Sequence, residues 1–136
     1  MADNSPNRLQ LSVVTTAKLI LEAECDSVLI PASEGYVTIL PNHTPLISLV
    51  GAGTLTYIDG GKEEILAVAG GFFEVSDNAV KLLVPLAERP DEIDVEAARK
   101  EAEDARNEMS GATVTEQTLI RRRLARAEAR LAVGSG

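Results

Sequence analysis

The stretch from Ser33 to Ile47 reads SEGYVTILPNHTPLI and places two short apolar runs on either side of a stiff polar corner. Gly35 can adopt the positive backbone φ that a tight turn requires. Pro41 and Pro45 each fix φ, remove a backbone donor and push the preceding residue into extended geometry. We therefore predict two strands joined by a corner that holds His43, the only histidine of the chain. The residues alone favour an ordinary strand connection, because such clusters are usually turns.

Short apolar runs of this kind recur through the first 84 residues. Residues 9–13 alternate strictly between apolar and polar side chains, as a half-buried strand does. Asp59-Gly60 lies between two β-rich runs and predicts a hairpin, because a type I′ turn needs positive φ at both central positions. Strands at intervals of roughly ten residues, separated by turn signals, indicate a β-sandwich or barrel. We expect about ten strands, and the clearest runs are 9–13, 18–21, 26–31, 36–40, 46–50, 54–58, 64–69, 72–75 and 79–84.

The pattern changes from strand to helix near Pro90. Asp94 is a good N-cap, Ser110-Gly111 is a helix stop, and Thr113 with Glu116 forms a capping box. The first helix carries a narrow apolar seam of Val95, Ala98, Ala102, Ala105 and Met109, and the second carries a stripe of Ile120, Leu124, Ala127 and Leu131. These signals predict helices at 94–109 and 113–133 that form an antiparallel hairpin, with a frayed tail at 133–136.

The predicted fold class is therefore α+β. An N-terminal antiparallel β-sandwich domain of about ten strands covers residues 1–88, and a C-terminal αα-hairpin covers residues 89–136. Alanine seams bury little apolar area, at about 0.8 kcal/mol per methyl-sized group. The hairpin is expected to open or detach at modest cost.

Composition narrows the class of protein further. The chain has 136 residues, of which 45% are apolar and 3% aromatic, with no tryptophan, so we expect an aliphatic core. No apolar run approaches the 18 residues of a membrane span, and residues 1–8 form no signal or transit peptide. The single cysteine, Cys25, excludes an internal disulfide, fits a reducing compartment and is expected to be a small core residue.

The net charge of −8 is unevenly distributed. Residues 1–113 have a balance of −11 and residues 114–136 a balance of +3. An acidic body argues against nucleic acid as the main partner. A basic tip on an acidic body suggests that the tip meets an acidic surface.

The basic residues of the second helix are candidates for that contact. They are Arg121, Arg122, Arg123, Arg126 and Arg130. Arg122, Arg126 and Arg130 are spaced i, i+4, i+8, so they share a face and repel one another. The residues leave two interpretations open, a solvated helix face or a surface for an acidic protein. Nucleic acid is disfavoured because no aromatic side chains are interleaved to stack bases.

The order of these features resembles the epsilon subunit of the rotary ATP synthase, of the bacterial and chloroplast type. The resemblance is strongest at Ser33-Glu34-Gly35 followed by the run from Ile39 to Leu46, with Thr38 where that family has a second glycine. It extends to Gly51-x-Gly53, to Ala69-Gly70-Gly71-Phe72 and to Ile93-Asp94. The arrangement of a sandwich, an acidic alanine-rich helix and a basic second helix is also similar.

The resemblance implies a non-catalytic rotor subunit of the central stalk in a proton-translocating ATP synthase. It implies that the sandwich packs on the gamma subunit and that its loops touch the c-ring through Glu34, Gly35 and Tyr36, with His43 close by. The hairpin would lie folded on the sandwich or extend into the alpha and beta subunits and inhibit ATP hydrolysis. Arg121, Arg122, Arg123, Arg126 and Arg130 would then meet the beta subunit. The chain would be peripheral on the cytoplasmic face of the bacterial plasma membrane.

Some members of that family bind ATP through an Ile-Asp-x-x-Arg-Ala motif. This chain has Ile93 and Asp94 but carries Ala97 where the arginine would be. Asp94 also has the simpler role of a helix cap. We therefore expect no cofactor, and weak or absent binding of ATP as a regulatory ligand.

Two other functions compete with this interpretation. One is a free-standing adaptor that binds an acidic protein through its arginine helix. The other is a small β-barrel metalloenzyme, which needs several converging His or carboxylate ligands. With one histidine, one cysteine, no Gly-rich phosphate loop and no recognisable carboxylate pair, the sequence predicts neither a catalytic residue nor a metal site.

Overall fold

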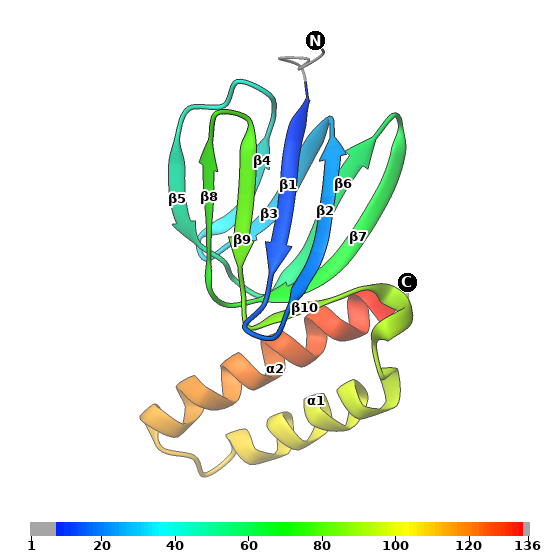
Figure 1. The fold of residues 1–136 in the computed structure, drawn as a ribbon. Helices are drawn as coiled ribbons and strands as arrows, with labels where there is room; N and C mark the ends of the chain where they lie inside the picture. The colour runs from blue at the N-terminus through cyan, green and yellow to red at the C-terminus, as the bar shows by residue number, and fades with distance from the viewer. Residues whose placement is uncertain (1–7, 135–136) are drawn as a thin grey trace.

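Ten strands of alternating sequence build two five-stranded sheets that stack face to face, and a helical hairpin lies at one end of them (Figure 1). The computed structural model describes residues 8–134. The strands are β1 (Leu9–Val14), β2 (Leu19–Cys25), β3 (Ser27–Ala32), β4 (Gly35–Ile39), β5 (Leu46–Leu49), β6 (Gly53–Asp59), β7 (Lys62–Ala69), β8 (Phe72–Ser76), β9 (Ala79–Leu83) and β10 (Leu86–Glu88). The predicted β-sandwich is confirmed.

The two sheets have strand orders β2-β1-β9-β8-β5 and β10-β7-β6-β3-β4. We call them sheet A and sheet B. Every pair of neighbouring strands is antiparallel except β1 and β9, which run parallel. The antiparallel prediction therefore holds for all pairs but this one, which joins the first strand to the ninth.

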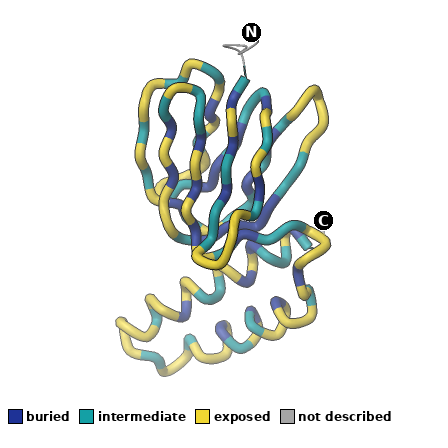
Figure 2. The backbone as a smooth tube through the Cα atoms, in the orientation of Figure 1, coloured by how far each residue is buried: buried dark blue, intermediate teal, exposed yellow. Residues whose placement is uncertain are grey.

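The core lies between the sheets and is aliphatic, as the composition predicts (Figure 2). Strand alternation turns Leu11, Ile30 and Leu55 inward to full burial, and Phe73 is the largest fully buried side chain of the described residues. Cys25 is also fully buried in this core, as expected. Burial raises the pKa of its thiol to about 11.

Turn chemistry accounts for the close strand connections. Gly60 and Gly61 have φ of +59° and +85°, so they are the central pair of the β6–β7 hairpin turn. Gly71 has φ of +76°, and a Cβ placed there would lie 2.8 Å from the Cα of Val84 and closer still to the carbonyl oxygen of Leu83. Gly71 therefore allows a close approach between its own backbone and that of Leu83 and Val84.

A short 3₁₀ helix, η1 (Pro90–Glu92), leads into α1 (Val95–Met109) and α2 (Val114–Gly134). Asp94 caps α1 by accepting a hydrogen bond from the backbone N–H of Ala97 at 3.0 Å. Thr113 and Glu116 form the predicted capping box, with N–H to oxygen distances of 2.8 and 3.2 Å. The predicted antiparallel hairpin is confirmed within about one residue at each end.

Helix α2 lies between α1 and the sandwich, so two of its faces are covered (Figure 1). The face toward α1 meets the predicted seam, in which Ala98, Ala102 and Ala105 are buried. Its carboxyl end packs Val133 against Ile93 and Ala67 on the outer side of sheet B. The prediction of a frayed tail is wrong for Val133 and Gly134, because this contact keeps α2 helical to Gly134. Residues 135 and 136, which the prediction also covered, lie outside the described residues.

Two strands differ from the predictions. Strand β2 continues to Cys25, beyond the predicted end at residue 21, because it pairs with β1 along its length. Strand β10 follows Pro85, where no strand was predicted, and pairs with β7 at the edge of sheet B. The expectation that residues 1–8 carry no targeting peptide concerns a segment that, apart from Arg8, lies outside the described residues.

Candidate functional site: an interaction face at the helical end of the sandwich

A continuous row of apolar side chains crosses the outer face of sheet A. Leu49 pairs with Phe72, Phe72 with Leu83, Leu83 with Val14, and Val14 with Leu19. Residues that pair directly across strands present their side chains on the same face of a sheet. We call the five residues Leu49, Phe72, Leu83, Val14 and Leu19 the apolar row.

The row is exposed although its side chains are large. The exposed fractions are 63% for Leu49, 42% for Phe72 and 46% for Leu83. The neighbouring residues Phe73 and Leu82 point the other way and fill the core. The next row along the same strands is polar at Glu74 and Lys81. A contiguous exposed apolar patch with a polar border is typical of a protein interaction site.

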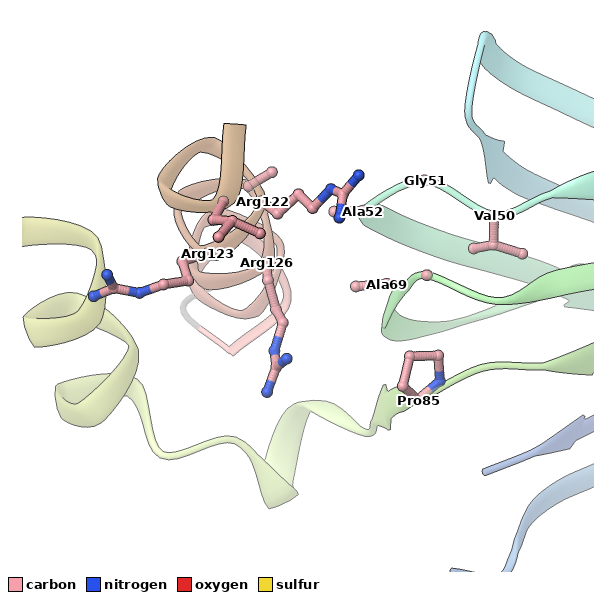
Figure 3. A pocket seen from close by; sticks show the side chains of 11 residues that line it. Val50, Gly51, Ala52, Ala69, Pro85, Arg122, Arg123 and Arg126 are labelled. Atoms are coloured by element: carbon pink, nitrogen blue, oxygen red, sulfur yellow. The ribbon is translucent and has the colours of Figure 1, made fainter. Parts of the chain in front are cut away.

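A pocket adjoins one end of this row and separates the sandwich from α2 (Figure 3). Its volume is about 580 Å³. One wall consists of small or apolar residues from the ends of the strands, and the other is the arginine-bearing face of α2. The lining residues are Val50, Gly51, Ala52, Ala69, Gly70, Pro85, Leu119, Arg122, Arg123, Ala125 and Arg126. We call this cavity the arginine pocket.

The five predicted contact arginines of α2 fall into two groups. Arg123 and Arg130 are held in ion pairs within the molecule. Arg121, Arg122 and Arg126 form no ion pair with any residue in the range 8–134. Only this second group is available to a partner while the hairpin is folded. The shared arginine face predicted from spacing is therefore divided by the acidic residues that surround it.

Arg123 joins the two helices of the hairpin. Its guanidinium contacts Glu101 at 2.9 Å and Glu108 at 2.7 Å, both on α1. In Figure 3 it extends toward α1, whereas Arg122 extends toward the sandwich. The two glutamates raise the pKa of Arg123, and the hydrogen bond from Arg123 lowers the pKa of Glu108.

Arg130 joins α2 to the sandwich. It donates two hydrogen bonds, of 2.8 and 3.4 Å, to the carboxylate of Glu88 at the end of β10. The two side chains are only 21% and 24% exposed. This is the one ion pair between sandwich and hairpin among the described residues.

The residues predicted to meet a c-ring do not form one patch. Glu34 and Gly35 lie at the turn before β4, at the helical end of the sandwich. The backbone of this turn is held by a hydrogen bond from Ser33 N–H to the Leu49 carbonyl, next to Gly51 of the arginine pocket. Tyr36 lies flat on sheet B, where its hydroxyl accepts a hydrogen bond from Thr54 N–H at 3.1 Å.

His43 lies beyond the other end of β4, so the expectation that it is close to Glu34 is wrong. Five extended residues separate the two ends of β4, which is roughly 16 Å. The His43 corner is fixed to the β8–β9 turn instead, where Asn42 N–H donates to the side chain of Asn78 at 2.6 Å. Residues that are adjacent in the sequence motif are thus at opposite ends of the sandwich.

Comparison with known proteins identifies the chain. A family model described as the ATP synthase Delta/Epsilon chain β-sandwich domain matches residues 8–90. The ATP synthase epsilon chain of Solibacter usitatus is 38% identical over 93% of this chain and 96% of its own length. The chain belongs to the ATP synthase epsilon family. It is therefore a non-catalytic stalk subunit of ATP synthase.

Other epsilon chains and solved structures agree with this assignment. The epsilon chain of an Anaeromyxobacter species is 40% identical over 92% of this chain and 96% of its own length. A chain in the cryo-EM structure of the Euglena gracilis mitochondrial ATP synthase has a TM-score of 0.81 at 24% identity, and covers 97% of this chain and 84% of its own length. The second comparison shows a shared fold.

The two candidate nucleotide residues of this epsilon-family chain both have structural roles. Asp94 caps α1, and Ile93 packs against Val133 and Ala67. Ala97, at the position of the motif arginine, lies on α1 facing a small cavity shared with Arg126 and Arg130. The ATP prediction is left unchanged by these contacts.

Neither a metal site nor a membrane-spanning helix is found in the described part of the chain. Within residues 8–134, no group of three or more His, Cys, Asp or Glu side chains is arranged to hold a metal ion. No helix in the same range is both long enough and apolar enough to cross a membrane. The apolar row itself was missed from the sequence, because its five members come from five strands and only the register brings them together.

Proposed function

We propose that this epsilon-family chain is a rotor subunit that links the gamma subunit to the c-ring and limits ATP hydrolysis through its C-terminal hairpin. The observation that carries the proposal is the apolar row, a strip of apolar side chains across sheet A in which Leu49, Phe72 and Leu83 are exposed. The proposed location of the chain, as part of the complex, is the cytoplasmic face of a bacterial plasma membrane.

The gamma subunit is the proposed partner of the apolar row. Burial of a large apolar side chain contributes about 1.5–3 kcal/mol. Covering Leu49, Phe72 and Leu83 would therefore supply part of the free energy of binding. Replacing Phe72 with Ser should weaken binding to the gamma subunit by at least tenfold, measured by calorimetry. Glu74→Ser, two residues along the same strand and on the same face, is the matched control.

The c-ring is proposed to meet the turn that carries Glu34, Gly35 and Tyr36. This turn is exposed and lies at the same end of the sandwich as the apolar row. Single cysteine substitutions at Glu34 and at His43 report which end of the sandwich meets the c-ring. Crosslinking of Glu34→Cys to the c subunit, without crosslinking of His43→Cys, is the expected result. The reverse result would move the contact to the opposite end.

The alpha and beta subunits are the proposed partners of the hairpin after it extends. Arg121, Arg122 and Arg126 form no ion pair within residues 8–134 of the folded state, and Arg123 and Arg130 are released only when their ion pairs break. ATP hydrolysis by the assembled enzyme should rise several-fold when the three free arginines are replaced by glutamine. A chain that ends at Asp91 should give at least the same rise. No change with either variant would remove the inhibitory part of the proposal.

A further inference from the structure

The apolar row and the arginine pocket form one continuous surface. Three strands that contribute to the row continue directly into the pocket wall. Leu49 is followed by Val50 and Gly51, Phe72 is preceded by Gly70 and Gly71, and Leu83 is followed by Val84 and Pro85. A partner that covers the row therefore reaches the mouth of the pocket.

The chemistry of the pocket differs from that of the row. Both Arg122 and Arg126 line the pocket; in Figure 3 Arg122 extends from α2 toward the sandwich, whereas Arg126 points downward in the view. Neither has an ion-pair partner among residues 8–134. The opposite wall offers backbone and the small side chains of Gly51, Ala52 and Gly70, with no acidic residue. Both arginine side chains are exposed, and a carboxylate that enters the pocket would gain charge-assisted contacts with them. The pocket thus complements an acidic side chain.

We propose that the partner covering the apolar row also inserts an acidic side chain into the arginine pocket, so that it binds only the folded hairpin at full strength. This rests on the proposed function, which names the gamma subunit as the partner of the row. Residues that line the pocket lie within two positions of Leu49, Phe72 and Leu83 in the sequence, which favours a segment of that partner over a small free anion. The volume of about 580 Å³ can accommodate such a segment's side chains.

The position of the hairpin decides whether the pocket exists. Its arginine wall belongs to α2 and its other wall belongs to the sandwich, so the two separate when the hairpin leaves. A partner that binds both walls has a higher affinity for the chain with the hairpin folded than for the chain with it detached. Binding must shift the equilibrium toward the folded hairpin by that same ratio of affinities. The gamma contact and the hairpin position are therefore linked without any change in the sandwich.

The test measures binding of the purified gamma subunit to the full chain. Replacing Arg122 and Arg126 together with glutamine should weaken binding by roughly 10- to 100-fold, the range expected for lost charge-assisted contacts. Arg121→Gln is the matched control, because Arg121 is a free arginine of the same helix that does not line the pocket. That control should change affinity by less than about threefold, as single exposed charges do.

The possible results separate the acidic contact in the pocket from the gamma contact on the apolar row. Equal affinity of the double variant and the control overturns the acidic contact, while loss of binding in Phe72→Ser keeps the proposed gamma contact intact. Unchanged binding in Phe72→Ser overturns the gamma contact itself. A dimer of the chain alone that Phe72→Ser dissociates would assign the row to a second copy.

A second readout follows the hairpin directly. Ala67 is fully buried beneath Ile93 and Val133, so a cysteine placed there reacts with an alkylating reagent only when α2 lifts. Saturating gamma subunit should slow this reaction in the Ala67→Cys chain by about the factor measured for affinity. The slowing should be lost in the Arg122 and Arg126 variant. Equal rates with and without gamma subunit would overturn the linkage.

Discussion

The ion pair between Glu88 and Arg130 allows the stability of the folded hairpin to be tested quantitatively. Replacing Glu88 with Gln keeps the size of the side chain and removes its charge. Hydrogen bonds to charged groups contribute about 1.5–3 kcal/mol, and exposed ion pairs about 0.2–1 kcal/mol. Because both side chains are about three-quarters buried, we expect a cost near the middle of this range, about 1.5 kcal/mol. That is roughly a tenfold increase in the population with α2 detached.

The assay is the alkylation rate of the Ala67→Cys chain, which reports detachment of α2 from sheet B. Cys25 remains in the sandwich core and is the internal control for global unfolding. A matched perturbation is Glu128→Gln, which breaks the exposed pair with Arg106 inside the hairpin and should change the rate by less than threefold. If Glu88→Gln accelerates labelling no more than Glu128→Gln does, the Glu88 contact does not hold the hairpin to the sandwich.

Four further predictions follow from single features. Gly71→Ala should cost at least 2–3 kcal/mol in chemical denaturation, because both its positive φ and its contact with the backbone of β9 exclude a Cβ; a smaller loss would contradict the close approach. Cys25 should resist alkylation in the native protein at pH 8, since burial raises its pKa to about 11, and rapid modification without denaturant would show that the core opens. The hydrogen bond from Arg123 lowers the pKa of Glu108 below its ordinary value of about 4.5. The contribution of this contact to the stability of the fold is therefore present above pH about 4.5 and is lost as the pH falls through the lowered pKa. Melting curves against pH should show this loss and Glu108→Gln should abolish it, whereas the same acid dependence in both chains would exclude Glu108 as its source. Calorimetry should detect weak or no ATP binding, because Ala97 replaces the motif arginine, and tight binding would show that other residues substitute for it.

The sandwich was predictable because its determinants are local. Alternation in residues 9–13, the glycines at 60 and 61 and the prolines around the His43 corner each specify a strand or a turn within a few residues. Strand β10 was missed because it has three residues and follows a proline, which together give no alternation to detect. The helix bounds were predictable from caps, which are also local signals.

The candidate site was less predictable because it depends on residues far apart in the chain. Arg130 meets Glu88 across 42 positions, and Arg123 meets Glu101 across 22, so spacing along α2 could not separate paired from free arginines. The apolar row likewise requires the register of five strands. The error at His43 came from treating proximity in sequence as proximity in space across a fully extended strand.

The parallel pairing of β1 with β9 has a consequence for how the chain folds. The first strand is an interior strand of sheet A, and its second neighbour, β9, is synthesised about 65 residues after it. Non-local pairing of this kind is slow to form, because the entropy cost of closing the intervening loop comes before any stabilising contact is made. During synthesis, sheet A can close only after residue 83 has emerged, and the hairpin emerges later still. Sheet A can therefore form before the hairpin that folds onto the sandwich has been made, and until then the arginine pocket lacks its α2 wall.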